Sequence, residues 1–355
     1  MPGAGAVADI KDVDVIAPNF KRRLSGVTST IVQLVPFQAK LGTRIVVIGP
    51  GLPDNAGLPK IGFAALLGLW RAPRGRRHRI WHARRNNEMG FGLFLRDVLR
   101  MPLKLVFTSA AQRRHSAYTR FLIRRMDAVI ATSDRSASFL KVPFRVIRHG
   151  VDLDAFHPPR GADDTMAASG LPGRHLVGCF GRIRHQKGTD LFVRAMIELL
   201  PHHPDWTAIV CGRATASHTA FADGLRAEIA AAGLSNRILF LGEVPDVKVW
   251  YRRLSLYVAP SRNEGFGLTP LEAMASQTAV VASDAGAYAE MITPGKTGAV
   301  VPAGDYEALR EAIRPYLADP DMTERHAAAG LAEVRENFAL ENEAKAVNAV
   351  YAGLL

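Results

Sequence analysis

Short apolar runs alternate with longer amphipathic stretches along the whole chain. Runs rich in β-branched residues predict strands in the first half at Val13–Pro18, Arg44–Ile48, Arg79–Ala83, Leu103–Thr108, Ala128–Thr132 and Phe144–Ile147. The same pattern restarts in the second half at Leu176–Phe180, Thr207–Cys211, Ile238–Leu241, Leu256–Ala259, Ala279–Ala282 and Gly298–Val301. Helical patterns such as Val27–Leu41 and Glu88–Leu99 separate the runs. Strands that alternate with helices in this way form βαβ units, so the pattern predicts two doubly wound parallel sheets.

A segment containing two prolines and a glycine interrupts this alternation at residues 154–164 and indicates a linker. We therefore expect an α/β protein with Rossmann-like domains at residues 1–157 and 158–337. Three helical patterns follow Pro302 without further strands, and the last of them, in residues 338–355, is expected to return to the first domain. Such sheets bind ligands beyond the carboxyl ends of their strands. Two of them facing a cleft favour an enzyme that transfers a group between two substrates.

The charge is distributed unevenly between the two halves. The chain of 355 residues carries a formal net charge of +12, but residues 1–157 hold 26 Lys and Arg against 10 Asp and Glu. Residues 158–355 hold 19 against 23. A basic half joined to a mildly acidic half indicates that only the first half meets a polyanion. Charge alone leaves nucleic acid, anionic lipid and phosphorylated glycolipid open as partners.

The remaining composition favours a cytoplasmic protein. The two cysteines, Cys179 and Cys211, lie inside apolar runs and are expected to be buried thiols. The most apolar window, Ile61–Trp70, is shorter than the roughly 20 residues that span a bilayer. We expect a cytoplasmic enzyme that associates peripherally with the inner membrane through its basic half.

The first segment with chemical content is Gly178–Gly188, in which a predicted strand ends at Gly181 and a helix begins near Gly188. Arg182 and Lys187 lie in the loop between them. Basic side chains beside the free N–H groups of a helix N-terminus suit a diphosphate. They would balance the charge of a departing nucleoside diphosphate without a metal ion.

The second segment is Pro260–Ala275, where a loop with two glycines connects a strand to a helix that opens at Thr269-Pro270. Glu264 lies in the loop and Glu272 in the first turns of the helix, so both carboxylates are expected to point toward one ligand. A carboxylate accepts hydrogen bonds from the hydroxyls of a sugar or ribose. The glycines let the backbone approach such a ligand closely.

Three Asp-x-Asp pairs match a metal-binding spacing, at residues 12–14, 152–154 and 319–321. None follows a predicted strand near the two glutamates, and a cation site needs convergent oxygen ligands. We therefore expect no catalytic metal and no cofactor.

The combination of Gly-Arg…Lys-Gly at 181–188 with Glu264-x7-Glu272 resembles the retaining GT-B glycosyltransferases of the glycosyl-transferase group 1 family. Ser25-Gly26 before a helix and Gly150-Val-Asp152 add to this resemblance. The family implies catalytic roles for Glu264, Arg182 and Lys187. It implies that the nucleotide-sugar donor contacts Gly26, Gly181, Arg182, Lys187, Glu243, Gly265, Phe266, Gly267, Leu268, Thr269 and Glu272. In this scheme Arg182 and Lys187 bind the diphosphate, Glu264 the transferred sugar and Glu272 the ribose.

The acceptor side is predicted from the basic half. Its arginine-rich stretches at 71–85 and 113–125 resemble bacterial lipopolysaccharide-core transferases, which implies an anionic, Kdo-bearing glycolipid as acceptor and GDP-mannose as donor. Candidate acceptor contacts are Arg22, Arg84, Arg85 and His115. The family often has a histidine after an N-domain strand, where this chain has Ala110 and Ala111. His115 follows several residues later.

Alternatives remain at this point. A UDP-hexose donor fits the same motifs. The high isoelectric point also suggests a nucleic-acid-binding protein, but Trp81 alone fits base stacking among the basic residues, so nucleic acid is the less favoured partner. A sugar-nucleotide epimerase would require further acid–base groups. The sequence leaves the linkage and the oligomeric state open.

Overall fold

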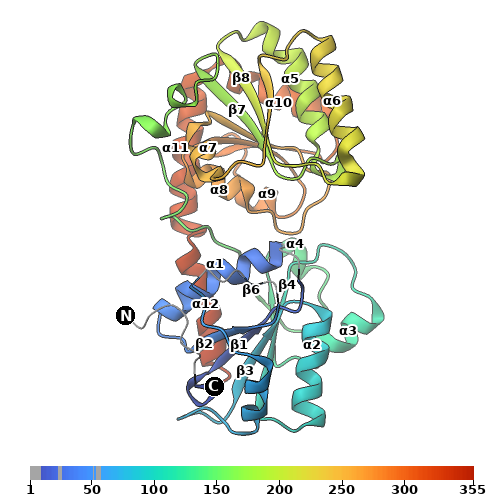
Figure 1. Ribbon diagram of the computed structural model, residues 1–355, viewed down its shortest axis with the longest axis vertical. Coiled ribbons are helices and arrows are strands. Elements are labelled where there is room, and N and C mark those ends of the chain that lie inside the picture. Colours follow the sequence, from blue (N-terminus) through green and yellow to red (C-terminus); the bar gives the residue numbers. More distant parts are fainter. Residues whose placement is uncertain (1–8, 23–25, 51, 53–56) are drawn as a thin grey trace. The chain divides into compact units, whose positions relative to one another are not determined.

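The structure is a computed structural model that describes residues 9–22, 26–50, 52 and 57–355. The chain forms two compact domains, the first comprising Met1–Gly150 with Leu340–Leu355 and the second Val151–Ala339 (Figure 1). Each domain contains a six-stranded sheet in which every neighbouring pair of strands is parallel. The predicted α/β architecture with two doubly wound sheets is confirmed.

The chain enters the second domain between Gly150 and Val151, a little before the predicted boundary at residue 157. Phe156 packs in the core of the second domain, and the Val151 N–H donates to the Phe338 carbonyl at 2.8 Å. The proline-containing segment that indicated a linker is therefore part of the second domain.

The sheet of the first domain has the strand order β2-β1-β3-β4-β5-β6. Its elements are β1 (Val15–Pro18), α1 (Gly26–Lys40), β2 (Ile45–Ile48), η3 (Phe63–Trp70), β3 (Arg79–Ala83), α2 (Asn86–Leu93), η4 (Phe94–Val98), β4 (Leu103–Ser109), α3 (Ala117–Ile123), β5 (Ala128–Ala131), α4 (Asp134–Ala137), β6 (Arg145–Val146) and α12 (Leu340–Ala352).

The sheet of the second domain has the order β12-β11-β10-β7-β8-β9. Its elements are β7 (His175–Phe180), α5 (Thr189–Leu199), β8 (Trp206–Cys211), α6 (Thr219–Ala231), β9 (Ile238–Gly242), α7 (Val247–Arg253), β10 (Leu256–Ala259), α8 (Thr269–Ala275), β11 (Ala279–Ser283), α9 (Tyr288–Met291), β12 (Gly298–Val301), α10 (Tyr306–Ala318) and α11 (Pro320–Asn337).

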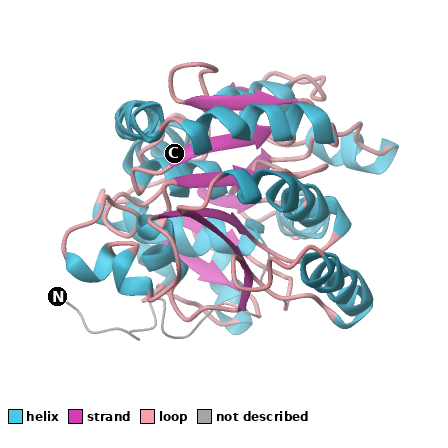
Figure 2. Cartoon of the chain, turned by 90° about the horizontal axis from the view of Figure 1, so that it is seen from above, coloured by secondary structure: helices cyan, strands magenta, loops and turns pink. Residues whose placement is uncertain are grey.

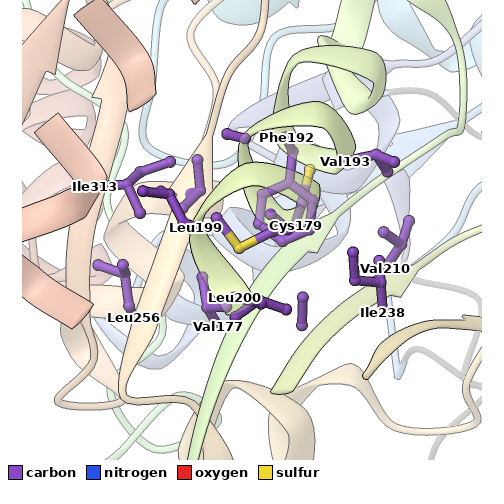
Figure 3. Packing of buried hydrophobic residues seen from close by; sticks show 14 of the residues in the cluster. Val177, Cys179, Phe192, Val193, Leu199, Leu200, Val210, Ile238, Leu256 and Ile313 are labelled. Carbon is purple, nitrogen blue, oxygen red and sulfur yellow. The ribbon is translucent and has the colours of Figure 1, made fainter. Parts of the chain in front are cut away.

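Both faces of each sheet are covered by helices (Figure 2). In the first domain Ile16, Val46 and Phe107 belong to a core beneath η3, α2 and α3. The alternate strand residues, such as Val15 and Val47, belong to a second core beneath α1 and α12. In the second domain Val177 and Cys179 of β7 pack against Phe192 of α5 (Figure 3). Burial on both faces explains why the strands read as continuous apolar runs rather than as alternating ones.

The C-terminal helix α12 is fastened to the first domain by polar contacts as well as by its apolar face. The Tyr351 hydroxyl is 2.6 Å from His82 Nδ1 on β3, and the Gln38 side chain of α1 donates to Asn348 at 2.9 Å. The Glu343 carboxylate accepts from the Gly150 N–H at 2.8 Å and lies 2.7 Å from His149 Nδ1. Burial lowers the pKa of His82 well below its usual value, so this histidine is neutral in the network.

Two segments of the first domain differ from expectation. The apolar window Ile61–Trp70, for which the pattern of residues predicted no element, contains the 3₁₀ helix η3. Residues 71–79, which are rich in glycine, proline and arginine and have the composition of a disordered loop, are held in place by Arg79. This arginine is 0% exposed and donates to the carbonyls of Val13 and Ile10 at 2.8 and 2.7 Å. Arg79 is therefore a structural residue and does not belong to the solvated basic surface.

Within the described residues, none of the helices combines the length and the apolar character that crossing a bilayer requires.

Candidate active site

The two motif segments of the second domain follow neighbouring strands at the point where the strand order reverses. From β7 the chain proceeds through β8 to β9, and it then returns to the other side of β7 with β10. The loop after β7 contains Arg182 and Lys187, and the loop after β10 contains Glu264. A crevice at such a switch point is where doubly wound sheets bind their ligands.

Close backbone packing holds these two loops together. Gly188 has φ +69°, and a Cβ added there would lie 1.9 Å from the Pro260 carbonyl oxygen, so only glycine allows this approach. The Arg262 N–H donates to the Gln186 carbonyl at 2.9 Å. The Arg262 guanidinium donates to both carboxylate oxygens of the buried Asp190 at 2.7 and 2.8 Å. A paired fork of this kind fixes the direction of both partners.

Lys187 and Glu264 form an ion pair at the centre of the site. The Ser261 hydroxyl also donates to the Glu264 carboxylate, at 3.4 Å. Burial lowers the pKa of Lys187 to about 8, and the positive charge of Arg184 contributes in the same direction. The lysine thus carries a charge that is poorly solvated in a region suited to an anion.

Glu272 is half-buried in the first turn of α8, where the Tyr251 hydroxyl donates to its carboxylate at 2.9 Å. Burial raises the pKa of Glu272 to about 6, although the hydrogen bond from Tyr251 and the charge of Lys187 oppose the shift. The charge of Lys187 therefore acts on Glu272 as well as pairing with Glu264. That both carboxylates point toward one ligand stays a prediction.

The other donor candidates lie around this pair. Arg182 is exposed, and its guanidinium makes no hydrogen bond or ion pair with the described part of the chain. Glu243, at the end of β9, is exposed and lies 3.6 Å from Arg213. Gly181 ends β7 with φ +132°. Gly265, Phe266, Gly267, Leu268 and Thr269 form the turn into α8, whose first N–H groups are free of helical partners.

Gly267 provides a stability prediction for the turn. Its φ is +83°, and an added Cβ would lie 2.4 Å from the Tyr288 ring. Gly267→Ala is therefore expected to lower the free energy of unfolding by about 2–4 kcal/mol, from backbone strain and overpacking together. Gly224→Ala is the matched control, because Gly224 is exposed in α6 with no atom within 4 Å of the added Cβ. Urea denaturation measures both variants, and Gly224→Ala should leave the free energy of unfolding unchanged or raise it. Equal destabilisation of both variants would contradict the proposed strain at Gly267.

Except for His115, the candidates of the first domain follow the two strands at its own switch point, β1 and β3. Arg22 follows β1, is exposed, and lines a cleft of about 690 Å³ whose walls include Phe20, Phe63 and Phe91. Gly26 opens α1, with open space around it. Ser25 lies outside the described residues.

Arg84 and Arg85 follow β3 and are both half-buried. The Arg85 guanidinium donates to Glu88 at 2.6 Å, to Asn19 at 2.9 Å and to Thr28 at 3.2 Å. The Arg84 guanidinium donates to the His82 carbonyl at 3.2 Å. His115 follows β4, half-buried, with Nε2 3.4 Å from the Ser109 hydroxyl. Burial and the charges of Arg113 and Arg120 lower the pKa of His115.

Four of the six carboxylates in the three Asp-x-Asp pairs have structural partners. Asp12 and Asp14 pair with Arg74 and Arg44, respectively. Asp152 accepts two backbone N–H groups of its own turn, and Asp319 caps α11. Within the described ranges no group of three or more potential metal ligands occurs.

Three contributors to the site were not predicted. Tyr251, on α7, and Tyr288, on α9, have no sequence signal that would connect them with α8. The Arg262–Asp190 pair joins the two motif segments, and Arg262 lies inside the second of them. For this pair, the only sequence signal was that Arg262 is a basic residue in the loop of the second motif.

Comparison with known proteins places this geometry in context. The family described as glycosyl transferases group 1 matches residues 163–332. The chain is 72% identical, over 98% of both chains, to the lipopolysaccharide core biosynthesis mannosyltransferase LpcC of Rhizobium leguminosarum bv. viciae. It is 55% identical to the lipopolysaccharide core biosynthesis mannosyltransferase LpsB of Rhizobium meliloti, over 98% of this chain and all of that one. The crystal structure of Anabaena Alr3699/HepE in complex with UDP shares the fold, with a TM-score of 0.82 at 20% identity over 96% of this chain and 100% of that one.

Proposed function

This chain belongs to the glycosyl transferases group 1 family, and we propose that it transfers mannose from GDP-mannose to the core of a lipopolysaccharide precursor. The observation that carries the proposal is the convergence of Lys187, Glu264 and Glu272 at the switch point of the second domain. The names of two relatives that match nearly the full length support the sugar and the acceptor class.

The second domain holds the donor in this proposal. Arg182 and Lys187 bind the diphosphate, for which a planar guanidinium and a compact ammonium are both suited. The free N–H groups at the start of α8 add donors for phosphate oxygens. Glu272 accepts hydrogen bonds from the ribose hydroxyls and Glu264 from the transferred sugar. Glu243 lies beside the base.

The reaction proceeds with retention at the anomeric carbon. The bond between that carbon and the diphosphate oxygen breaks, and its electron pair leaves with the diphosphate. The acceptor hydroxyl forms the new bond on the same face, and its proton passes to the departing phosphate oxygen. The protein's part is electrostatic, because Arg182 and Lys187 stabilise charge that grows on the leaving group.

The first domain binds the acceptor, an anionic glycolipid, at the cytoplasmic face of the inner membrane. Arg22 lines an open cleft, whereas Arg85 and Arg84 are tied to neighbours in the same region. Arg22 is therefore the candidate best placed to contact an acceptor phosphate or carboxylate directly. Arg85 instead donates to Glu88, Asn19 and Thr28. His115 lies beyond the next strand.

Transfer assays with a panel of GDP- and UDP-hexoses test this proposal. The expected result is transfer of mannose from GDP-mannose to a Kdo-bearing lipid A acceptor, with thermal stabilisation of the protein by GDP. Transfer from a UDP-hexose but not from GDP-mannose would show that the donor assignment is wrong. Absence of transfer with every donor, together with tight binding of RNA or DNA, would overturn the function.

The same assay in EDTA tests the proposed independence from metal ions. Activity should persist, because the two basic side chains take the place of a cation at the diphosphate. Complete loss in chelator that Mn²⁺ or Mg²⁺ restores would show that a metal ion takes part.

A further inference from the structure

Large apolar side chains are exposed on one layer of the first domain. Nine such side chains are exposed among the described residues, and seven of them lie on η3, η4 and α3: Phe63, Leu67, Trp70, Phe94, Val98, Tyr118 and Phe121. These elements cover the same face of the sheet, the one opposite α1 and α12. We call these seven side chains the apolar ridge.

Aromatic contacts link the ridge residues of η3 and η4. Phe63 contacts Phe20, Phe20 contacts Phe91, and Phe91 contacts Phe94, with ring centroids 6.1, 5.4 and 6.4 Å apart. The Trp70 indole N–H donates to the Leu99 carbonyl at 2.8 Å, which joins the end of η3 to the end of η4. The neighbouring helices α2 and α3 lie side by side (Figure 1). Monomeric proteins rarely expose a large contiguous apolar surface without a partner.

The helix η3 is apolar on all sides. Leu66 and Leu69 are buried against the sheet, while Phe63, Leu67 and Trp70 face outward. A soluble surface helix normally carries polar residues on its outer side. The outward apolar residues of η3 therefore do not serve the core of the domain.

Basic side chains surround the ridge. Arg71 follows Trp70, Arg100 follows Val98 and Arg124 follows Phe121, all three exposed. Their guanidiniums form no ion pair within the described residues. Residues 60–127 contain 16 Lys and Arg but only three Asp and Glu. Each of those three carboxylates is paired with an arginine or lysine: Glu88 with Arg85, Asp97 with Arg96, and Asp127 with Arg96 and Lys104.

We propose that the apolar ridge inserts into the interfacial region of an anionic lipid bilayer while the surrounding arginines contact the lipid headgroups. This inference rests on the proposed function, in which the acceptor is a membrane glycolipid. Apolar residues framed by Lys and Arg, with Trp at the border, are typical of surfaces that lie in a membrane interface. A second copy of the chain would bring like charges together, which disfavours self-association through the same surface.

Insertion of the ridge would also fix the position of the acceptor cleft relative to the bilayer. Phe63 belongs to the ridge and also lines the cleft that Arg22 lines, and Phe91, whose ring contacts the ridge residue Phe94, lines the same cleft. When the ridge is inserted, the cleft opens at the level of the headgroups. A glycolipid could then place its sugar in the cleft without leaving the bilayer.

Vesicle flotation tests the proposal with a matched pair of double variants. Leu67→Ser with Val98→Ser removes the two most exposed ridge side chains, which are 71% and 65% exposed. Leu41→Ser with Phe144→Ser removes two exposed apolar side chains elsewhere in the same domain, at 40% and 43%. Both double variants should unfold at nearly the wild-type temperature, because exposed positions contribute little to stability.

The expected result is a roughly hundredfold loss of partition onto phosphatidylcholine vesicles containing phosphatidylglycerol for the ridge variant, from about tenfold for each lost apolar side chain. The control should bind as the wild type does. The difference should persist at high salt, because apolar insertion is not screened whereas the arginine contribution fades. Trp70→Phe should remove most of the quenching of fluorescence by brominated lipid.

Equal binding of the ridge variant and the wild type would overturn the proposal. So would a wild-type dimer that the ridge substitutions convert to monomers without loss of vesicle binding, since the ridge would then be an interface between copies. Transfer to a delipidated, water-soluble acceptor decides the proposed function independently, and the ridge variant should retain it. The two assays therefore test membrane insertion of the ridge and the proposed transferase activity separately.

Discussion

Lys187→Ala is expected to lower kcat by about 10²–10³, which is the range for loss of one preorganised group that stabilises transition-state charge. Lys187 forms an ion pair with Glu264, and the charge of Glu272 also acts on it. Steady-state transfer from GDP-mannose measures the effect. Lys296→Ala is the control, because Lys296 is exposed before β12, at the opposite end of the strands from the site, and should retain full turnover.

The pH dependence gives a second measure of the same lysine. Burial lowers the pKa of Lys187 to about 8, so the ligand-free enzyme loses this charge as the pH rises through 8. The ratio kcat/KM for the donor reports groups of the free enzyme and should fall on this alkaline side. Lys187→Arg should move that fall to higher pH, since a guanidinium stays protonated. Near-wild-type turnover of Lys187→Ala, or an alkaline limb that Lys187→Arg leaves in place, would refute the assignment.

Glu264→Gln and Glu272→Gln are expected to differ in kinetic profile. Glu264 forms an ion pair with Lys187 and, in the proposed function, accepts hydrogen bonds from the transferred sugar, so its substitution should lower kcat by about 10²-fold, as for other groups that act on developing charge. Glu272, as a ribose contact, should instead weaken donor binding by about 1–3 kcal/mol, the usual cost of a lost charged hydrogen bond. Isothermal titration with GDP together with kcat measurements separates the two effects.

Two further observations sharpen this comparison. The pKa of Glu272 is about 6, so donor binding should also weaken below pH 6 in the wild type, as the carboxylate is protonated, but not in Glu272→Gln. Tyr251→Phe removes the neutral partner of Glu272 without touching the ligand and should reproduce only part of the loss in binding. Identical profiles for the two glutamine variants would contradict the division of roles.

The strand positions could be predicted from the sequence because each strand is buried on both faces. A short apolar run such as Val177–Phe180 fits only a buried strand, whereas the residue at which a helix ends is less clearly marked. The predicted helix at residues 88–99 is divided into α2 and the π-helix η4, and Gly92 packs against Trp81 in a contact that its spacing did not reveal. Charge was harder to interpret. Arg79 and Arg85 appear in an arginine-rich stretch, but one is buried among carbonyls and the other is held by three side chains.

The candidate site shows the same contrast. Glu264, Lys187 and Glu272 were identified because a local motif of glycines and charges surrounds each of them. Tyr251 and Asp190 reach the site from helices whose sequences carry no such mark, and only the adjacency of β7 and β10 brings them there. Contacts that depend on strand order are invisible to a pattern read along one chain.

The placement of α12 sets an order on biosynthesis. Residues 151–339 form one uninterrupted domain, which can fold as soon as they leave the ribosome. The first domain lacks one wall of its core until residues 340–355 arrive, because Leu340, Val347 and Tyr351 complete the apolar cluster beneath α1. Until residues 340–355 have been synthesised, that face of the nascent sheet remains uncovered and can bind chaperones or aggregate. The half of the protein that is synthesised first is therefore the half that is completed last.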